Sequence, residues 1–327
     1  MEISAAVAER TFSLPGIAVI QRMQEQCRLE AISLQEGGMA GAFGHCRHGS
    51  AEFSSFTVDF ALHGRFAPPS THYLSCYVHE VASGSWCAGM PLVADTMLIV
   101  LPDSACELML GPGARVSMAL APLHGYVKRA VDGYSDSFGL PSKQFALFGP
   151  QCHAGTPLRA LYELLFAGLV GERDHELSRL AISGSLDFLI DERGMRALSA
   201  HATPLSSYGS HCRAHFPAFR RAVQFMRENL QRDIYMEEVA AAAQISDRSL
   251  RLAFDDLLGI SPTRYLSLLR LHQANRQLST YGVRRQSVKS VAMSCGMWNL
   301  SRFAANYRRA FGEHPSDTLM RACSFAS

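Results

Sequence analysis

The chain has 327 residues, of which 48% are hydrophobic and 18% charged, so it holds enough apolar sequence to bury the cores of two domains. Its longest apolar runs, such as residues 97–101 and 164–170, are far shorter than the roughly 18 residues that cross a membrane, and we expect no membrane partner. Nine cysteines without a CxxC pair, and a start without the layout of a secretory signal, indicate a cytoplasmic protein with free thiols.

Charge is distributed unevenly along the chain. Residues 216–327 hold 16 Arg and Lys against 9 Asp and Glu, a balance of +7, whereas residues 1–215 hold 15 against 20, a balance of −5. A basic segment behind an acidic one is typical of a polyanion-binding module attached to a domain of another kind.

Residues 29–126 have the pattern of short strands. Phe56, Val58, Phe60 and Leu62 alternate with polar or small residues, which predicts a strand with one buried face. Turn signals recur about every ten residues, and this spacing favours an antiparallel barrel or sandwich. Residues 157–191 then show the helical spacing of two amphipathic helices. We expect the second of them to form a dimer contact through Leu177, Leu180, Gly184 and Phe188.

The remaining chain is expected to be helical. Residues 206–217 lack sustained periodicity and are interpreted as a linker between an N-terminal domain, residues 1–205, and a C-terminal domain, residues 218–327. Apolar spacing predicts a helix-turn-helix over residues 236–257, with Ser246 as the cap of its second helix. A longer helix over residues 262–279 precedes a second helix-turn-helix over residues 287–311, in which Gly296 suits a turn of positive φ.

Two such units fit double-stranded DNA. A connecting helix of about 17 residues spans roughly 25 Å at 1.5 Å per residue. With the radii of the two units, the second helices then lie near one duplex turn apart, about 34 Å, and enter successive major grooves on one DNA face.

An ordered set of residues runs through both helix-turn-helix units and the connecting helix: Val239-Ala240, Ile245-Ser246, Leu250, Phe254, Gly259-Ile260-Ser261-Pro262, Tyr265-Leu266, Arg270-Leu271, Ala274, Leu278, Ser287-Val288, Val291-Ala292, Cys295-Gly296, Ser301-Arg302-Phe303, Arg308, Phe311-Gly312 and Pro315. This set resembles the DNA-binding domain of the AraC/XylS family of bacterial transcription regulators. The resemblance covers about a third of the chain. Gln244, Met297 and Tyr307 depart from the family pattern, where glycine or phenylalanine is usual.

The resemblance implies that the second helix of each unit reads bases. In the first helix-turn-helix, Arg248 and Arg251 suit bidentate contacts to guanine, and Leu252 occupies a position where many relatives carry a base-reading arginine. Trp298 either contacts the DNA backbone or packs against the connecting helix. The expected base contacts are Asp247, Arg248, Arg251, Asn299, Ser301, Arg302 and Asn306, and the expected phosphate contacts are Arg284, Arg285, Lys289, Arg308 and Arg309.

The resemblance also implies a role for the N-terminal domain. In the family, a cupin-like barrel followed by helices commonly senses a small organic effector and forms the homodimer, and activation, with RNA polymerase as partner, is the commoner mode. The alternative is a domain without a ligand that serves only dimerisation or protein docking. Side chains that point inward on the strands are the expected lining of an effector pocket, namely Phe56, Phe60, Tyr73, Tyr77, Trp86 and Met118.

The alternative class of protein is an enzyme-like metal cupin fused to a DNA-binding tail. Residues 45–48 and 211–215 contain histidines with ligand-like spacing, but neither stretch has a second half to complete a metal site, and we interpret both as loops. A GxSxG elbow and a phosphate-binding glycine loop are also missing, so we predict no metal, no cofactor and no enzymatic activity. Cys295, beside the second turn, is interpreted as a buried thiol in preference to a redox sensor.

Overall fold

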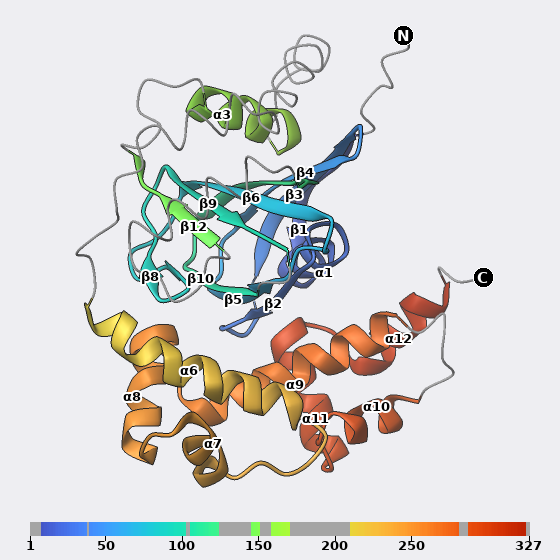
Figure 1. The fold of residues 1–327 in the computed structure, drawn as a ribbon. Coiled ribbons are helices and arrows are strands. Elements are labelled where there is room, and N and C mark those ends of the chain that lie inside the picture. The colour runs from blue at the N-terminus through green and yellow to red at the C-terminus, as the bar shows by residue number, and fades with distance from the viewer. Residues whose placement is uncertain are drawn as a thin grey trace. The chain divides into compact units, whose positions relative to one another are not determined.

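The computed structural model describes residues 8–37, 39–102, 105–123, 145–150, 158–170, 210–280 and 287–324 (Figure 1). They belong to two compact units, one containing residues 1–31 and 39–208 and the other containing residues 32–38 and 209–327. None of the helices described there combines the length and the hydropathy that a membrane span requires.

The first unit is built on two antiparallel sheets. The seven-stranded sheet has the strand order β1-β3-β4-β11-β6-β9-β12, and the five-stranded sheet has the order β2-β5-β10-β7-β8. The strands are β1 (Ala8–Pro15), β2 (Leu29–Ser33), β3 (Ala40–His48), β4 (Ala51–Val58), β5 (Leu62–Phe66), β6 (His72–Glu80), β7 (Trp86–Cys87), β8 (Met90–Pro91), β9 (Thr96–Val100), β10 (Cys106–Leu110), β11 (Ala114–Pro122) and β12 (Phe145–Phe148).

Both sheets contribute side chains to one apolar core. Phe56 and Val58 of β4 and Leu62 of β5 are buried in it, although β4 and β5 belong to different sheets. The prediction of a single strand through these residues is wrong, because the chain turns at Asp59, whose carboxylate accepts a hydrogen bond from the Ala40 amide at 2.7 Å. Alternation continues across the turn because both strands face the same core.

The described strands do not form a closed barrel, so the cupin-like barrel is not confirmed. Two sheets around one core correspond to the sandwich that the turn spacing also allowed. Strand β1 and helix α1 (Gly16–Cys27) were not part of the sequence prediction. Pro15 ends the strand and directly precedes the first helical residue, where the N–H that proline lacks is not needed by the helix.

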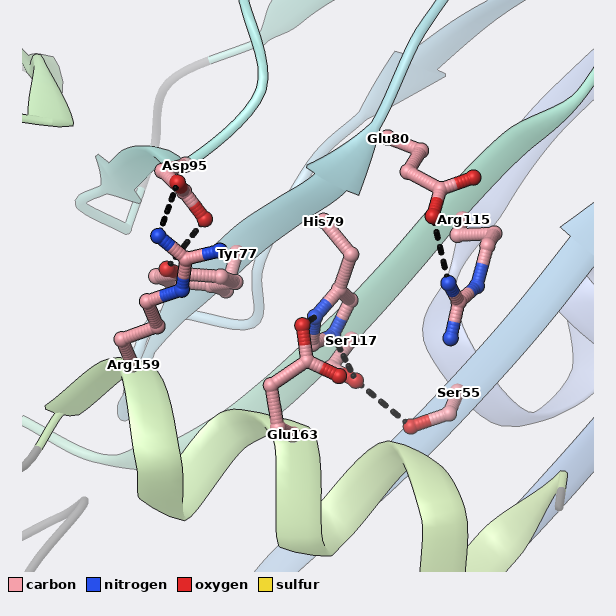
Figure 2. Close-up of polar contacts among 9 residues, drawn as sticks. All are labelled: Ser55, Tyr77, His79, Glu80, Asp95, Arg115, Ser117, Arg159 and Glu163. Atoms are coloured by element: carbon pink, nitrogen blue, oxygen red, sulfur yellow. Dashed lines mark hydrogen bonds and ion pairs between the residues drawn. The ribbon is translucent and has the colours of Figure 1, made fainter.

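Helix α3 (Leu158–Leu169) packs on the face of the seven-stranded sheet opposite this core (Figure 1). The second helix expected within residues 157–191, with its dimer contacts Leu177, Leu180, Gly184 and Phe188, lies outside the described residues. Figure 2 shows that polar side chains fasten α3 to the sheet: Arg159 pairs with Asp95 at 2.9 Å, and Glu163 contacts His79 at 3.2 Å. The helix is therefore held by specific bonds as well as by apolar packing.

The histidine at the centre of this contact has an ordered set of hydrogen bonds (Figure 2). Burial lowers the pKa of His79, so the ring is neutral. A neutral ring that donates from Nδ1 to the Glu163 carboxylate must accept at Nε2, where the Ser117 hydroxyl lies at 2.9 Å. Ser117 in turn accepts from Ser55 at 2.7 Å, which satisfies three buried polar groups in one chain of bonds.

From residue 210 onward, the described part of the second unit consists of helices joined by short turns. Its elements are α6 (Ser210–Glu228), α7 (Met236–Ala243), α8 (Asp247–Leu258), α9 (Pro262–Ser279), α10 (Val288–Ser294), α11 (Leu300–Phe311) and α12 (Pro315–Ser324). The linker predicted over residues 206–217 is wrong from residue 210 onward, because α6 already starts there; α12 lies in the region that was expected to be helical, although no separate helix was assigned to it. Buried Phe219 explains α6: its ring packs on Phe254 at a centroid distance of 4.9 Å.

The histidines considered as metal ligands lie in regular elements, so the prediction of loops is wrong. His45 is a buried residue of β3, and its Nδ1 lies 3.0 Å from the Ser54 hydroxyl of β4. Residues 211–215 lie within α6. Across the described parts of the chain, His, Cys, Asp and Glu side chains gather in no group of three that would hold a metal ion.

Candidate nucleic-acid interface

The first helix-turn-helix consists of α7 and α8. Between them Gln244 adopts a left-handed conformation with φ of 57°, and Ser246 caps α8 by accepting the Ser249 amide at 3.1 Å. Leu250 and Phe254 are buried on the inner face of α8, as their spacing predicts. The short turn and the cap fix the direction in which α8 leaves α7, and with it the face that α8 presents to solvent.

The second helix-turn-helix, α10 and α11, repeats this design with different turn residues. Gly296 has φ of 68°, which confirms the prediction of positive φ at this turn. Asn299 caps α11 by accepting the Arg302 amide at 2.9 Å, and Phe303 and Tyr307 are buried beneath the helix. Cys295 is buried as well and its pKa is raised by burial, which makes the thiol a poor nucleophile and favours the purely structural interpretation.

Helix α9 connects the two helix-turn-helix motifs, with α7 and α8 near one end and α10 and α11 near the other (Figure 1). At the first end Tyr265 packs on Phe254 of α8, with ring centroids 5.4 Å apart. At the second end the Asn275 side chain donates to the Tyr307 hydroxyl of α11 at 2.7 Å. Its 18 residues correspond to about 27 Å of helix, so α8 and α11 are fixed to one rigid spacer.

Helix α8 presents the arginines that sequence reasoning selected. Arg248 and Arg251 are both exposed on the face opposite Leu250. The Asp247 carboxylate contacts the Arg251 guanidinium at 2.9 Å, one helical turn away, and thereby orients it along the helix surface. An oriented guanidinium loses less freedom when it forms a bidentate bond to a base, which suits Arg251 for recognition.

Helix α11 exposes a different set of side chains. Ser301 and Arg302 are exposed, whereas Asn306 is half-buried. The side-chain oxygen of Asn299 is engaged in the helix cap, so this residue has only its amide donors left for a base. Among the expected phosphate contacts, Lys289, Arg308 and Arg309 are exposed, and Arg284 and Arg285 lie outside the described residues.

Two arginines to which the sequence analysis assigned no individual role have structural partners. Arg221 of α6 donates twice to the Ala243 carbonyl at the end of α7, at 2.6 and 3.1 Å. Arg270 of α9 donates to the Arg232 carbonyl at 2.5 Å, and burial lowers its pKa. No local sequence signal points to the first of these roles, because Arg221 lies 22 residues before Ala243.

The residues expected to line an effector pocket are buried in the first unit, but not around one cavity. Phe56, Phe60 and Met118 belong to the core between the sheets, whereas Tyr77 lies on the other face, where its ring stacks on Tyr162 of α3 at 4.7 Å. Tyr73 and Trp86 are also buried. A cavity of about 370 Å³ in this unit is lined by none of these six residues but by Gln24, Arg28, Glu30, Arg65 and Ala67.

Known proteins match the helical region. A family model described as a helix-turn-helix domain matches residues 239–321. Over 107 residues the chain is 42% identical to the XylDLEGF operon transcriptional activator of Pseudomonas putida, covering 33% of each chain. Over 100 residues it is 31% identical to the probable thc operon regulatory protein of Rhodococcus erythropolis, covering 31% of this chain and 30% of that one. The chain thus spans about a third of the length of the curated relatives it matches.

One solved structure that it resembles is a probable AraC family transcriptional regulator from Rhodopseudomonas palustris. The two share 39% identity over 32% of this chain and 96% of that one, with a TM-score of 0.30. Two helix-turn-helix units with exposed second helices on one connecting helix define a DNA-binding protein. The C-terminal region of the chain, residues 239–321, is a DNA-binding domain of the AraC/XylS type. Its matched relatives are regulators, which supports the prediction that it is not an enzyme.

Proposed function

We propose that this chain activates transcription by inserting α8 and α11 into successive major grooves of promoter DNA. The observation that carries the proposal is the attachment of both helices to α9 through buried contacts at its two ends. The length of α9, about 27 Å, together with the radii of the two helix-turn-helix motifs, suits major grooves that lie one duplex turn apart, about 34 Å. The activator named among its relatives supports activation, in which case RNA polymerase is a partner.

The test is a selection of genomic DNA fragments by the full-length protein, followed by anisotropy titration of the best fragment at several salt concentrations. Arg251→Ala is expected to lose about 5- to 150-fold of its preference over random DNA with little change in the salt slope, because a bidentate base contact is removed. Lys289→Ala is expected to weaken all sequences alike and to reduce the slope by about one.

The matched control is Arg47→Ala. Arg47 is 69% exposed and pairs with Glu52 at 2.9 Å, much as Arg251 is 71% exposed and pairs with Asp247 at 2.9 Å, but it lies on strand β3. It should leave both the preference and the slope unchanged. If Arg251→Ala behaves like this control, α8 does not read bases and the proposal fails.

For the first unit we propose control by a small organic effector and assembly of a homodimer. The six predicted pocket residues do not surround one cavity, so this proposal rests on the layout of the domain, and a ligand that binds only the folded unit must raise its melting temperature. A library of metabolites without a single hit would contradict the effector. The dimer contact is tested by charged substitutions at Leu180 and Gly184, and a dimer that survives them in sedimentation overturns that assignment.

A second candidate is a unit that serves only dimerisation or protein docking. One observation favours it: Phe56, Phe60 and Met118 already fill the space between the two sheets. Under this proposal the protein selects the same DNA site with and without added metabolites, and its first unit shows no ligand-dependent stabilisation. Under either candidate we place the protein in the cytoplasm with its DNA.

A further inference from the structure

Large apolar side chains are exposed at the second helix of each helix-turn-helix. Leu252 of α8 is 47% exposed, Trp298 just before the α11 cap is 54% exposed, and Leu300, the first residue of α11, is 37% exposed. A single exposed apolar residue needs no explanation, but these three lie on or beside the two helices that the proposed function places in the grooves.

The position of Leu252 on α8 sets it among the base-reading candidates. It follows Arg248 by four residues, one helical turn, and directly follows Arg251, whereas buried Leu250 and Phe254 lie on the opposite face. Leu252 therefore shares the surface that carries the two guanidinium groups. An apolar side chain beside the two guanidinium groups, on a helix that lies in the major groove, meets base edges.

Helix α11 offers fewer long polar side chains to DNA than α8 does. The side-chain oxygen of Asn299 is occupied by the helix cap, and Arg302 is the only long donor among the base contacts expected on α11. Trp298 does not bury its ring against α9, which was the alternative the sequence left open. The Trp298 ring and the Leu300 side chain are both exposed, and the two residues flank the cap residue Asn299 in the sequence.

Thymine is the base whose major-groove edge carries a methyl group, and apolar side chains recognise it there. We propose that Leu252 in the first helix-turn-helix, and Leu300 with Trp298 in the second helix-turn-helix, contact thymine methyl groups and so require A·T pairs at defined positions of both half-sites. This specificity rests on the proposed function, because it places α8 and α11 in the major groove.

The experiment removes only the methyl groups. In the DNA site selected by the full-length protein, each thymine is replaced in turn by deoxyuridine, which keeps base pairing, and binding is measured by anisotropy at one salt concentration. At least one position in each half-site should lose about fourfold in affinity, the effect of one buried methyl group. Leu252→Ala should lose sensitivity at the first half-site alone, and Leu300→Ala at the second alone.

Met320→Ala serves as the control, because Met320 is also exposed but lies on α12, which is not a second helix of either helix-turn-helix. It should retain the full response to deoxyuridine. The inference is overturned if no position responds, or if Leu252→Ala and Leu300→Ala respond as the unaltered chain does. In those outcomes the proposed function survives when Arg251→Ala still loses its sequence preference. A chain that binds all DNA alike overturns both.

A variant with unchanged affinity and deoxyuridine response, but reduced transcription in a reconstituted reaction, would assign the apolar side chains to a protein contact. That result also overturns the inference. Because all three residues are exposed, their alanine variants are expected to fold, and equal melting temperatures will verify this.

Discussion

Replacing Gly296 by alanine is expected to loosen the second helix-turn-helix far more than the same change at a comparable glycine. With φ of 68°, a residue bearing a Cβ costs about 1 to 2 kcal/mol at this turn. The new Cβ would also lie 2.5 Å from the Leu230 carbonyl oxygen and 2.9 Å from a terminal nitrogen of Arg270. Relief of that overlap adds about 1 to 3 kcal/mol, so the total is about 3 kcal/mol.

Gly259 provides the matched control. It has φ of 66°, almost the same conformation, but a Cβ there would meet no atom within 4 Å. Gly259→Ala therefore measures the backbone cost alone, about 1 kcal/mol. The difference between the two variants isolates the steric overlap at Gly296.

Amide hydrogen exchange of the full-length protein, followed by mass spectrometry of peptides from α10 and α11, gives the free energy of local opening. About 3 kcal/mol corresponds to exchange faster by about two orders of magnitude in Gly296→Ala. Gly259→Ala should accelerate exchange of peptides from α8 and α9 by about fivefold. Equal effects of the two substitutions would refute the reasoning, because they would show that the close approach of the Leu230 carbonyl costs nothing.

Three further predictions follow from the described contacts. Gln244→Gly should stabilise the first helix-turn-helix by about 0.5 to 1 kcal/mol in urea unfolding, since φ of 57° suits glycine; a lower midpoint would contradict this. Tyr307→Phe should cost about 1 to 2 kcal/mol, because the buried Asn275 amide loses an acceptor, and unchanged stability would argue against that bond. Burial raises the pKa of Tyr307 from 10.0 to about 12, so the neutral phenol stabilises the fold fully below pH 10 and less as the pH rises toward 12, a dependence that Tyr307→Phe should reduce. Burial lowers the pKa of His79 below 6.5, so the sheet-containing unit should be most stable above that pH and lose stability on acidification. Glu163→Gln should enlarge this loss, because the carboxylate raises the pKa of His79, and a melting temperature that stays constant between pH 7 and 5 would contradict the prediction.

The sequence predicted the DNA-binding region well because its signals are local. Ser246 and Gly296 are cap and turn residues whose conformations depend on their immediate neighbours. The outward direction of Arg248 and Arg251 follows from helical periodicity. Asn299 was expected to contact a base, but its side-chain oxygen caps α11, and the same residue type serves both roles.

The first unit was harder to predict because its organisation depends on distant contacts. Alternation through Leu62 could not reveal that the chain changes sheets at Asp59, since both strands face one core. The polar contacts of His79 join strands 38 residues apart and a helix 84 residues away, and no spacing rule connects them. In the same way, the lack of sustained periodicity over residues 206–217 did not reveal that α6 begins at Ser210 and packs through buried Phe219.

The attachment of α3 leaves that helix a single register on its sheet. Arg159, Tyr162, Glu163 and Phe166 all point to one side, and each meets a different residue below: Asp95, Ser75, His79 and Arg115. A slide by one helical turn, about 5.4 Å, would break all four contacts together, and purely apolar packing would tolerate such a slide far better. These four contacts therefore define one register of α3 on the sheet, which could change only if all of them were broken together.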